Sequence, residues 1–242
     1  MTTQLLLSTS NSLLEVDNIF ICVERMPKPE FFQKAGLNIA DTPMQQKERG
    51  TASQIIFFEN FYVEFIWIED EVAAEIYAVR TGIDFVGRCN WRQTGVSPFG
   101  IALRQKPDAT NSANEDEDDI WQKQPQASEI LLSFSSDNLV AQNEPLCFMI
   151  PDAIALPTLL KNFPNFQAEM ASHELGVKRM TGIEVTATLT NPLTQPLAML
   201  VESGEVQIEQ GHFPAIQLTF DNHVQREIIN AWEIGIPMTL KY

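Results

Sequence analysis

The sequence predicts an α+β protein in which strands and helices alternate along a chain of 242 residues. Two runs rich in β-branched and aromatic residues lie between residues 50 and 70 and break at Glu59-Asn60, which is typical of two antiparallel strands joined by a tight turn. A helical pattern follows over Asp70–Arg80. Because 44% of the chain is hydrophobic, one large domain or two joined modules can bury a sizeable core.

A strand and a short helix are expected before this hairpin. Glu15–Glu24 is rich in Val, Ile and Phe and should form a buried strand. Alternation gives this strand one face with Val16, Asn18, Phe20 and Cys22 and another with Asp17, Ile19, Ile21 and Val23. Pro27 and Pro29 then open a short helix that Gly36 ends.

The second strand of the hairpin, Phe61–Ile68, carries the first candidate for chemistry. Its two faces hold Phe61, Val63, Phe65 and Trp67 on one side and Tyr62, Glu64, Ile66 and Ile68 on the other. Both faces are apolar except at Glu64, so we expect the strand to be covered on both sides. A buried carboxylate needs a partner, a proton or a metal. Glu64 is therefore either a structural carboxylate, paired with an arginine or a backbone donor, or a pocket group whose pKa is raised by desolvation.

The helix over Asp70–Arg80 begins with acidic residues and ends before Gly82, as helix caps require. We expect it to pack on the outer face of the sheet, near Phe65 and Trp67. The apolar stripe predicted to make this contact consists of Val72, Ile76 and Val79.

The second half of the chain shows more short elements. Strands are expected over Ser97–Arg104, Ile130–Phe134, Pro145–Ile150, Val177–Thr188 and Ile236–Lys241, a helix over Leu156–Phe163, and a second hairpin over Val206–Asp221 that turns at Gly211. Residues 106–119 form a polar loop that ends in an acidic run, and we expect residues 108–119 to be mobile. Trp121 follows as a lid aromatic or a surface anchor.

Composition excludes several classes of partner. The formal net charge of -16 argues against nucleic acid and anionic membranes, since both select basic patches. The 3 cysteines are widely spaced and show no zinc or disulfide pattern, which fits a reducing compartment. The first residues lack the basic charge of a signal peptide, and no apolar run is long enough for a membrane helix. We therefore expect a cytoplasmic protein.

Several segments, in this order, resemble the glyoxalase-like branch of the vicinal oxygen chelate superfamily, which also contains bleomycin-resistance proteins and extradiol dioxygenases. They are VDNIFICVE, GTASQIIFFENFYVEFIWIED, SPFGIALR, EPLCFMIPD and GVKRMTGIEVT, between Val16 and Asp221. The resemblance implies paired βαβββ modules whose strands form a cupped mixed β-sheet around one pocket. We place an N-terminal module at 14–105 and a rearranged C-terminal module at 106–242.

In metal-dependent members, each module supplies one ligand from its first strand and one from its last. Those positions fall here on Asn18, Glu64, Gly182 and Gln217. Transition metals favour imidazole, thiolate and carboxylate, so one carboxylate and two amides make a poor site. We predict no cofactor and no bound metal. A divalent metal, held with the help of a nearby histidine, is the disfavoured alternative.

Three further residues are candidates for the pocket. His173 lies in a loop and is either solvated or a pocket group. Arg104 and Arg179 are each either a clamp for an anionic ligand or a structural ion-pair partner, since arginine binds carboxylates with two hydrogen bonds.

The resemblance implies a small-molecule ligand and leaves two functions open. The first is an enzyme, of lyase, isomerase or dioxygenase-like type, that acts on a small oxygenated substrate with Glu64 as the acid/base residue and with Asn18 and Gln217 orienting the substrate. The second is a non-catalytic protein that binds and sequesters a ligand, as bleomycin-resistance proteins do. A homodimer would fit this superfamily.

Overall fold

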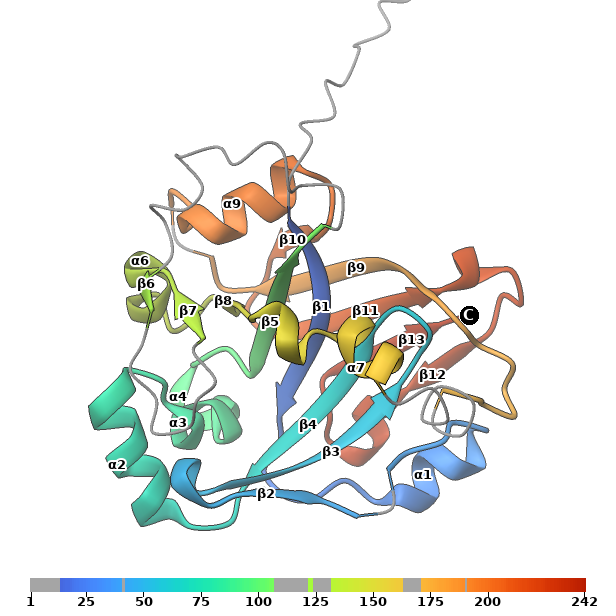
Figure 1. Cartoon of the computed structure of the whole chain (residues 1–242), viewed down its shortest axis with the longest axis horizontal. Coiled ribbons are helices and arrows are strands. Elements are labelled where there is room, and N and C mark those ends of the chain that lie inside the picture. The colour runs from blue at the N-terminus through green and yellow to red at the C-terminus, as the bar shows by residue number, and fades with distance from the viewer. Residues whose placement is uncertain (1–13, 41, 107–121, 124–131, 163–170, 190) are drawn as a thin grey trace, which may run out of the picture.

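The computed structural model describes residues 14–40, 42–106, 122–123, 132–162, 171–189 and 191–242. The strands among these residues form one eight-stranded and one five-stranded sheet. Figure 1 shows the orange and red strands of the five-stranded sheet crossing behind the blue and cyan strands of the larger sheet. The predicted mobile segment 108–119 and Trp121 lie outside the described residues.

The strands are β1 (Leu14–Cys22), β2 (Met44–Gln46), β3 (Thr51–Phe57), β4 (Tyr62–Ile68), β5 (Phe99–Gln105), β6 (Gln122–Lys123), β7 (Ser133–Phe134), β8 (Leu146–Met149), β9 (Met180–Ala187), β10 (Gln207–Gln210), β11 (Ala215–Phe220), β12 (Ile228–Asn230) and β13 (Met238–Lys241). The α-helices are α1 (Pro29–Lys34), α2 (Glu71–Thr81), α3 (Phe85–Cys89), α4 (Trp91–Thr94), α6 (Ser136–Val140), α7 (Leu156–Asn162) and α9 (Gln195–Glu202). Short 3-10 helices are η1 (Lys47–Arg49), η3 (Asp152–Ile154), η4 (Asp221–His223) and η5 (Ala231–Ile234).

The eight-stranded sheet has the order β2-β3-β4-β1-β5-β8-β7-β6 and contains two modules of four strands each, β1 to β4 and β5 to β8. In the first module β1 runs parallel to β4, and α1 lies between β1 and β2 in the chain. In the second, β5 runs parallel to β8, and β7 and β6 follow in the same spatial order. Strands β1 and β5 are antiparallel neighbours at the centre. The predicted fold class, α+β with paired modules in a mixed sheet, is confirmed, and within the described residues the βαβββ order is seen in the first module.

The five-stranded sheet repeats this central scheme in shortened form. Strands β9 and β11 are antiparallel neighbours, β10 runs parallel to β9, and β13 runs parallel to β11. The predicted hairpin over Val206–Asp221 is therefore wrong, because β9 lies between β10 and β11. The physical reason is the helix α9, which follows β9 and carries the chain across to a parallel partner.

The strand pairing places the sheet boundary after β8, whereas the sequence predicts a module boundary between residues 105 and 106. Strands β6, β7 and β8 continue the first sheet, and the second sheet spans β9 to β13. The predicted division stays a prediction about folding units. Within the described ranges, none of the helices combines the length and apolar character needed to cross a membrane.

One hydrophobic core lies between the two sheets. The eight-stranded sheet contributes Ile19, Ile21, Val63, Phe65, Ile101 and Leu103, and the five-stranded sheet contributes Ile183, Val185, Ile216, Leu218, Met238 and Leu240. Helix α1 joins this layer through Phe32, whose ring stacks on Phe65 with 5.1 Å between centroids. We call the face of the eight-stranded sheet that meets the other sheet its outer face, and the opposite face its inner face. The predicted alternation along β4 is confirmed, since Phe61, Val63, Phe65 and Trp67 all belong to this core.

Helix α2 packs differently from the prediction. Val72, Ile76 and Val79 are 66%, 63% and 91% exposed, and Tyr77 is buried instead. Tyr77 packs with Ile66 on the inner face, so α2 does not lie against Phe65 and Trp67. The helix is attached through Tyr77, together with the buried Ala74 and Thr81, rather than through the β-branched stripe. The predicted ends are right, because Asp70 caps Ala73 N–H at 3.0 Å and Gly82 adopts a left-handed conformation.

A β-bulge changes the predicted faces of β1. The pairing of β1 with β5 shifts between Val16 and Asn18, so that Asp17 is the extra residue. Val16 therefore joins the outer core, although alternation placed it with Asn18. The bulge brings Asp17 to the inner side, where its carboxylate meets Arg104 and the start of α7. Asp17 and Asn18, although consecutive in β1, thus both lie on the inner face.

Candidate functional site

The inner face carries a cluster of buried and half-buried polar side chains, which we call the polar cluster. It consists of Asp17 and Asn18 from β1, Ser53 from β3, Tyr62 and Glu64 from β4, and Arg104 from β5. These strands are neighbours in the order β3-β4-β1-β5, and the alternation of each strand, together with the bulge at Asp17, turns these residues to the same side. The apolar side chains beside the cluster include Ile55, Phe57 and Leu156.

Glu64 lies near the middle of this face, opposite Phe20 of β1 and Ile55 of β3. Desolvation by burial raises the pKa of the Glu64 carboxyl, and the Ser53 hydroxyl and Arg49 offset part of the rise. Among the described residues, no lysine, arginine or histidine forms an ion pair with Glu64. Glu64 is therefore a carboxyl group suited to holding a proton, which the sequence offered as one of two interpretations.

Two acceptor atoms of the polar cluster lack hydrogen bonds within the described part of the chain. Asn18 is 2% exposed and its Oδ1 has no partner, and the same holds for Oδ2 of Asp17, which is fully buried. Asn18 pairs with Tyr62 across β1 and β4, so it lies on the same face as Glu64 and close to it. Buried acceptors of this kind call for a donor from water or from a ligand.

Tyr62 adds a hydrogen-bonding hydroxyl to the cluster. Burial raises the pKa of the Tyr62 phenol well above its ordinary value, and the nearby charges of Glu64 and Asp17 act in the same direction. Tyr62 therefore keeps its proton at neutral pH and can donate a hydrogen bond.

Arg104 is engaged in structural pairing. Its Nε lies 2.9 Å from Glu15 Oε1, and its Nη1 donates to Asp17 Oδ1. The backbone N–H of Leu156 also donates to Asp17 Oδ1, at 2.9 Å. Burial raises the pKa of Asp17, while Leu156 N–H and Arg104 offset part of the rise. Of the two predicted roles for Arg104, the ion pair is the one that the geometry supports.

His173 is buried and both of its ring nitrogens are occupied. Asn38 N–H donates to Nδ1 at 2.9 Å, and Nε2 lies 2.9 Å from the Phe57 carbonyl, which requires the neutral Nε2–H tautomer. The ring also packs against Phe58 at 4.8 Å. Burial lowers the pKa of His173 and keeps the ring neutral. His173 ties its loop to β3 and to the segment after α1, and it does not face Glu64.

The other two predicted pocket residues lie elsewhere. Gln217 belongs to β11, and its neighbours along the strand, Ile216 and Leu218, point into the core between the sheets. Gln217 therefore faces away from the eight-stranded sheet and does not share a cluster with Glu64. The side chain of Arg179 is 58% exposed and lies 3.6 Å from Glu59, so the structure does not bring it to the inner face either.

The donor set of the inner face does not fit a transition metal. Ile19 of β1 pairs with Ile101 of β5, so Gly100 in the second group of strands corresponds to Asn18 in the first. Likewise Phe148, which pairs with Ala102, corresponds to Glu64, which pairs with Phe20. Glycine and phenylalanine supply no ligand. Gly182, predicted at one of these places, lies on the five-stranded sheet. Within the ranges that the structure describes, no group of three or more His, Cys, Asp or Glu could hold a metal ion. The absence of a native metal stays a prediction.

Sequence reasoning found Glu64 and Asn18 but missed three members of the polar cluster, Asp17, Ser53 and Tyr62. Alternation along β4 already placed Tyr62 beside Glu64, and this signal could have been used. Nothing local marked Asp17, because the bulge that turns it inward depends on pairing with β5.

Comparison with known proteins supports the fold and no more. No protein-family model and no curated protein matches the sequence. Among solved structures, a hypothetical protein from Staphylococcus aureus matches with a TM-score of 0.55 and 11% identity, covering 94% of this chain and 98% of that chain. A methylmalonyl-CoA epimerase from Mycobacterium tuberculosis matches with a TM-score of 0.36 and 11% identity, over 58% of this chain and 90% of that chain. A Streptomyces coelicolor methylmalonyl-CoA epimerase has a TM-score of 0.36 and 13% identity, over 60% of this chain and 98% of that chain. The first of these likenesses spans nearly the whole chain, and that protein is described only as hypothetical.

Proposed function

We propose that the inner face of the eight-stranded sheet binds a small oxygenated organic molecule and that Glu64 exchanges a proton with it. The observation that supports this most is the environment of Glu64. Its carboxyl has a raised pKa and no ion-pair partner among the described residues, and the same cluster contains buried acceptors that lack hydrogen bonds. A carboxyl whose pKa is moved toward neutrality is suited to general acid–base catalysis.

Each member of the polar cluster has a role in this proposal. Asn18 Oδ1 and Asp17 Oδ2 accept hydrogen bonds, so they suit a ligand that carries a hydroxyl or N–H group. The Tyr62 hydroxyl donates to an oxygen of the ligand. Glu64 in its carboxylate form takes a proton from one atom of the substrate and returns it to a different atom of the substrate. Arg104 holds Asp17 in place and does not itself touch the ligand.

The second candidate is a protein that binds the same ligand without turnover. The structural use of Arg104 and His173 favours it, because both are engaged by the protein itself. Unlike Arg104 and His173, Glu64 has no ion-pair partner among the described residues, and it is the one feature of the predicted site that still favours an enzyme. A binding protein needs the acceptors and the apolar side chains of the inner face but not the titration of Glu64.

The replacement Glu64→Gln separates these functions because it keeps the shape of the side chain and removes its proton exchange. Compounds that copurify with the protein are released by denaturation, identified by mass spectrometry and offered back to both proteins. For an enzyme, Glu64→Gln should lower turnover by about a hundredfold or more while binding is retained. For a binding protein, wild type and variant bind equally and neither changes the compound. Glu59→Gln, the same change at the turn before β4, is the matched control.

A ligand-free measurement tests the environment of Glu64 independently. Burial raises the pKa of Glu64 above the usual 4.5, so the folded state binds more protons than the unfolded state. Wild-type stability therefore falls as pH rises from the unfolded-state pKa to the higher folded-state pKa. Glu64→Gln lacks this loss, so its melting temperature should gain on wild type with increasing pH. A difference that does not change between acidic and neutral pH, together with undiminished binding by Asn18→Leu, would exclude the inner face as the site.

A further inference from the structure

A recess lies away from the polar cluster, where the two halves of the chain meet. It has a volume of about 360 Å³ and is formed by the segment from α4 to β5, the loop before β8, the end of β9, the turn between β10 and β11, and η5. Cavities of this size accept small organic molecules. The recess is built from loops of both sheets, whereas the polar cluster lies on strands of one sheet.

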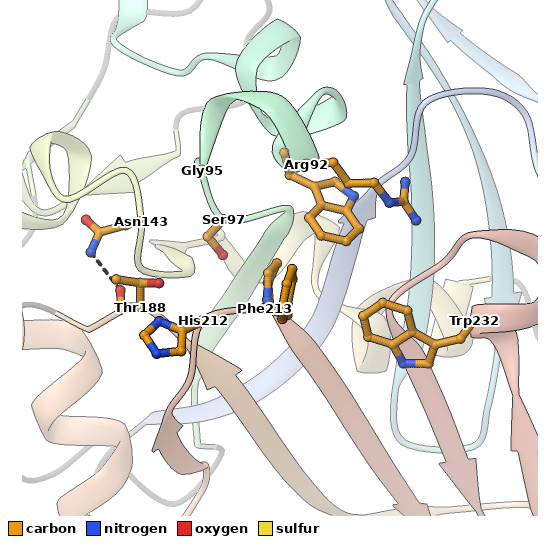
Figure 2. A pocket seen from close by; sticks show the side chains of 10 residues that line it. Arg92, Gly95, Ser97, Asn143, Thr188, His212, Phe213 and Trp232 are labelled. Carbon is orange, nitrogen blue, oxygen red and sulfur yellow. Dashed lines mark hydrogen bonds between the residues drawn. The ribbon is translucent and has the colours of Figure 1, made fainter.

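The recess has a polar end and an aromatic end. Figure 2 shows Ser97, Asn143, Thr188 and His212 gathered on one side, with Phe213 in the middle and Trp232 on the far side. Trp91 completes the aromatic end, and its ring meets that of Trp232 edge to face, at 84° and 6.3 Å between centroids. A planar ring that enters here can stack on one aromatic side chain while its edge meets another.

Among the described residues that line the recess, the one permanently charged group, Arg92, is already engaged by the protein. Arg92 lies over the Trp91 ring at 4.2 Å, but its guanidinium is already bound to Glu24 at 2.8 Å and to the Gly235 carbonyl at 2.7 Å. None of the described residues that line the recess is acidic, on a chain whose net charge is -16. The lining therefore suits a neutral ligand better than an ion.

Phe213 is presented on an anchored turn. It is 74% exposed, although exposure of a large aromatic side chain is unfavourable in water. The turn is fixed to the end of β9, because Gly211 N–H donates to the Ala187 carbonyl at 2.9 Å and the Thr188 hydroxyl donates to the Gly211 carbonyl at 3.2 Å. A side chain at Gly211 would meet Thr186 at 2.3 Å, so the turn can approach β9 this closely only with glycine. The structure thus holds Phe213 beside the recess before any ligand arrives.

We propose that this recess is a binding site for a neutral planar aromatic compound of one or two rings that carries one hydrogen-bonding group. The rings lie against Phe213 and Trp232, and the hydrogen-bonding group points toward Ser97, Asn143 and His212. A carbohydrate fits less well, since its many hydroxyl groups need acceptors around the whole ring, and the polar side chains here gather at one end.

The test uses 1-naphthol as the probe and the full-length protein in solution. Binding is followed by the NMR signals of the indole N–H groups, which we expect to shift for Trp91 and Trp232 and to stay in place for Trp67. The saturated analogue 2-decalol and methyl β-glucoside are titrated in parallel. Naphthol should bind more tightly than either, because decalol lacks aromatic faces and the glucoside lacks apolar ones.

Variants assign the site to the recess. Phe213→Ala should weaken naphthol binding by about three- to tenfold, and Phe213→Tyr should restore it. Val224→Ala, at another strongly exposed apolar residue, is the control and should change nothing. Because Phe213 is exposed, its replacement should leave the melting temperature unchanged. Equal binding of naphthol and decalol, tighter binding of the glucoside, or an unchanged affinity in Phe213→Ala would overturn the proposal. Glu64→Gln should leave naphthol binding intact, so this outcome is independent of the inner face.

Discussion

Replacing Arg104 by methionine tests whether the buried ion pair beside the polar cluster stabilises the inner face. Methionine keeps an unbranched apolar chain and removes the guanidinium, so Asp17 is left with the Leu156 N–H as its donor. The side chains of Arg104 and Asp17 are 9% and 0% exposed, so this ion pair is buried. Removing one partner of a buried pair costs about 3 to 5 kcal/mol. For a chain of this length, that corresponds to a fall in melting temperature of about 6 to 20 °C.

The dependence on pH gives this prediction a second, sharper form. Burial already raises the pKa of Asp17, and without Arg104 the pKa should rise further. A folded-state pKa above the unfolded value means that the folded state binds more protons, so stability falls as pH rises. The deficit of Arg104→Met should therefore be largest at neutral pH and should shrink in acid, where Asp17 is protonated in both states.

Calorimetry or urea unfolding from acidic to neutral pH measures both effects. Glu24→Gln is the matched control, because it removes the anion from a pair whose side chains are 38% and 46% exposed. That change should cost at most about 1 kcal/mol. The double variant Asp17→Asn, Arg104→Met should regain stability relative to Arg104→Met, since it no longer buries an unpaired carboxylate. Equal losses for Arg104→Met and Glu24→Gln would refute the reasoning.

Two further predictions concern elements outside the polar cluster. The pKa of His173 is lowered by burial, so wild-type stability should fall as pH drops below about 6.5, and His173→Gln should flatten this fall in a pH series of melting temperatures; an unchanged slope would contradict the neutral, doubly bonded ring. On α2, Val79→Ala should change the free energy of unfolding by less than about 0.5 kcal/mol, whereas Tyr77→Ala should cost about 3 kcal/mol, because Val79 is 91% exposed and Tyr77 is 2% exposed. A large cost at Val79 would mean that a partner covers α2.

Local patterns predicted what depends on local physics. The alternation of β4, the capping of α2 by Asp70 and the left-handed Gly82 all follow from short-range geometry, and all three are confirmed. Choices between two apolar surfaces depended on distant contacts and were less secure. The sequence of α2 offers two apolar surfaces, the stripe of Val72, Ile76 and Val79 and the side around Tyr77. Tyr77 is the one that packs, because the inner face of the sheet lies on that side of the helix.

Strand partners were the hardest to predict. The sequence around Gly211 has the composition of a hairpin, yet β9 separates the two strands that it connects. Strand β5 stands at the end of the predicted N-terminal module, yet it pairs with β8, which lies beyond that module, as well as with β1. Nothing in a short segment distinguishes these partners, because each strand offers the same backbone groups to either neighbour.

The candidate site was predictable to the same degree. The family resemblance paired Asn18 with Glu64, and the structure places both on the same face of the neighbouring strands β1 and β4. Gln217 was assigned by analogy between two halves of the chain, and the sheet order shows that the analogy joined the wrong modules. The role of His173 was out of reach, since its hydrogen-bond partners, Asn38 and Phe57, lie far away in the sequence.

The core between the two sheets has a consequence for how the chain behaves on dilution. Two separate chains would have to associate to cover the outer face of the larger sheet, and their contact would be lost at low concentration. Here both sheets belong to one chain, so the effective concentration of one for the other is fixed by the connecting segment and not by the number of molecules present. The outer face stays covered in a single molecule, and substitutions in the five-stranded sheet should be felt on the inner face through the layer that both sheets share.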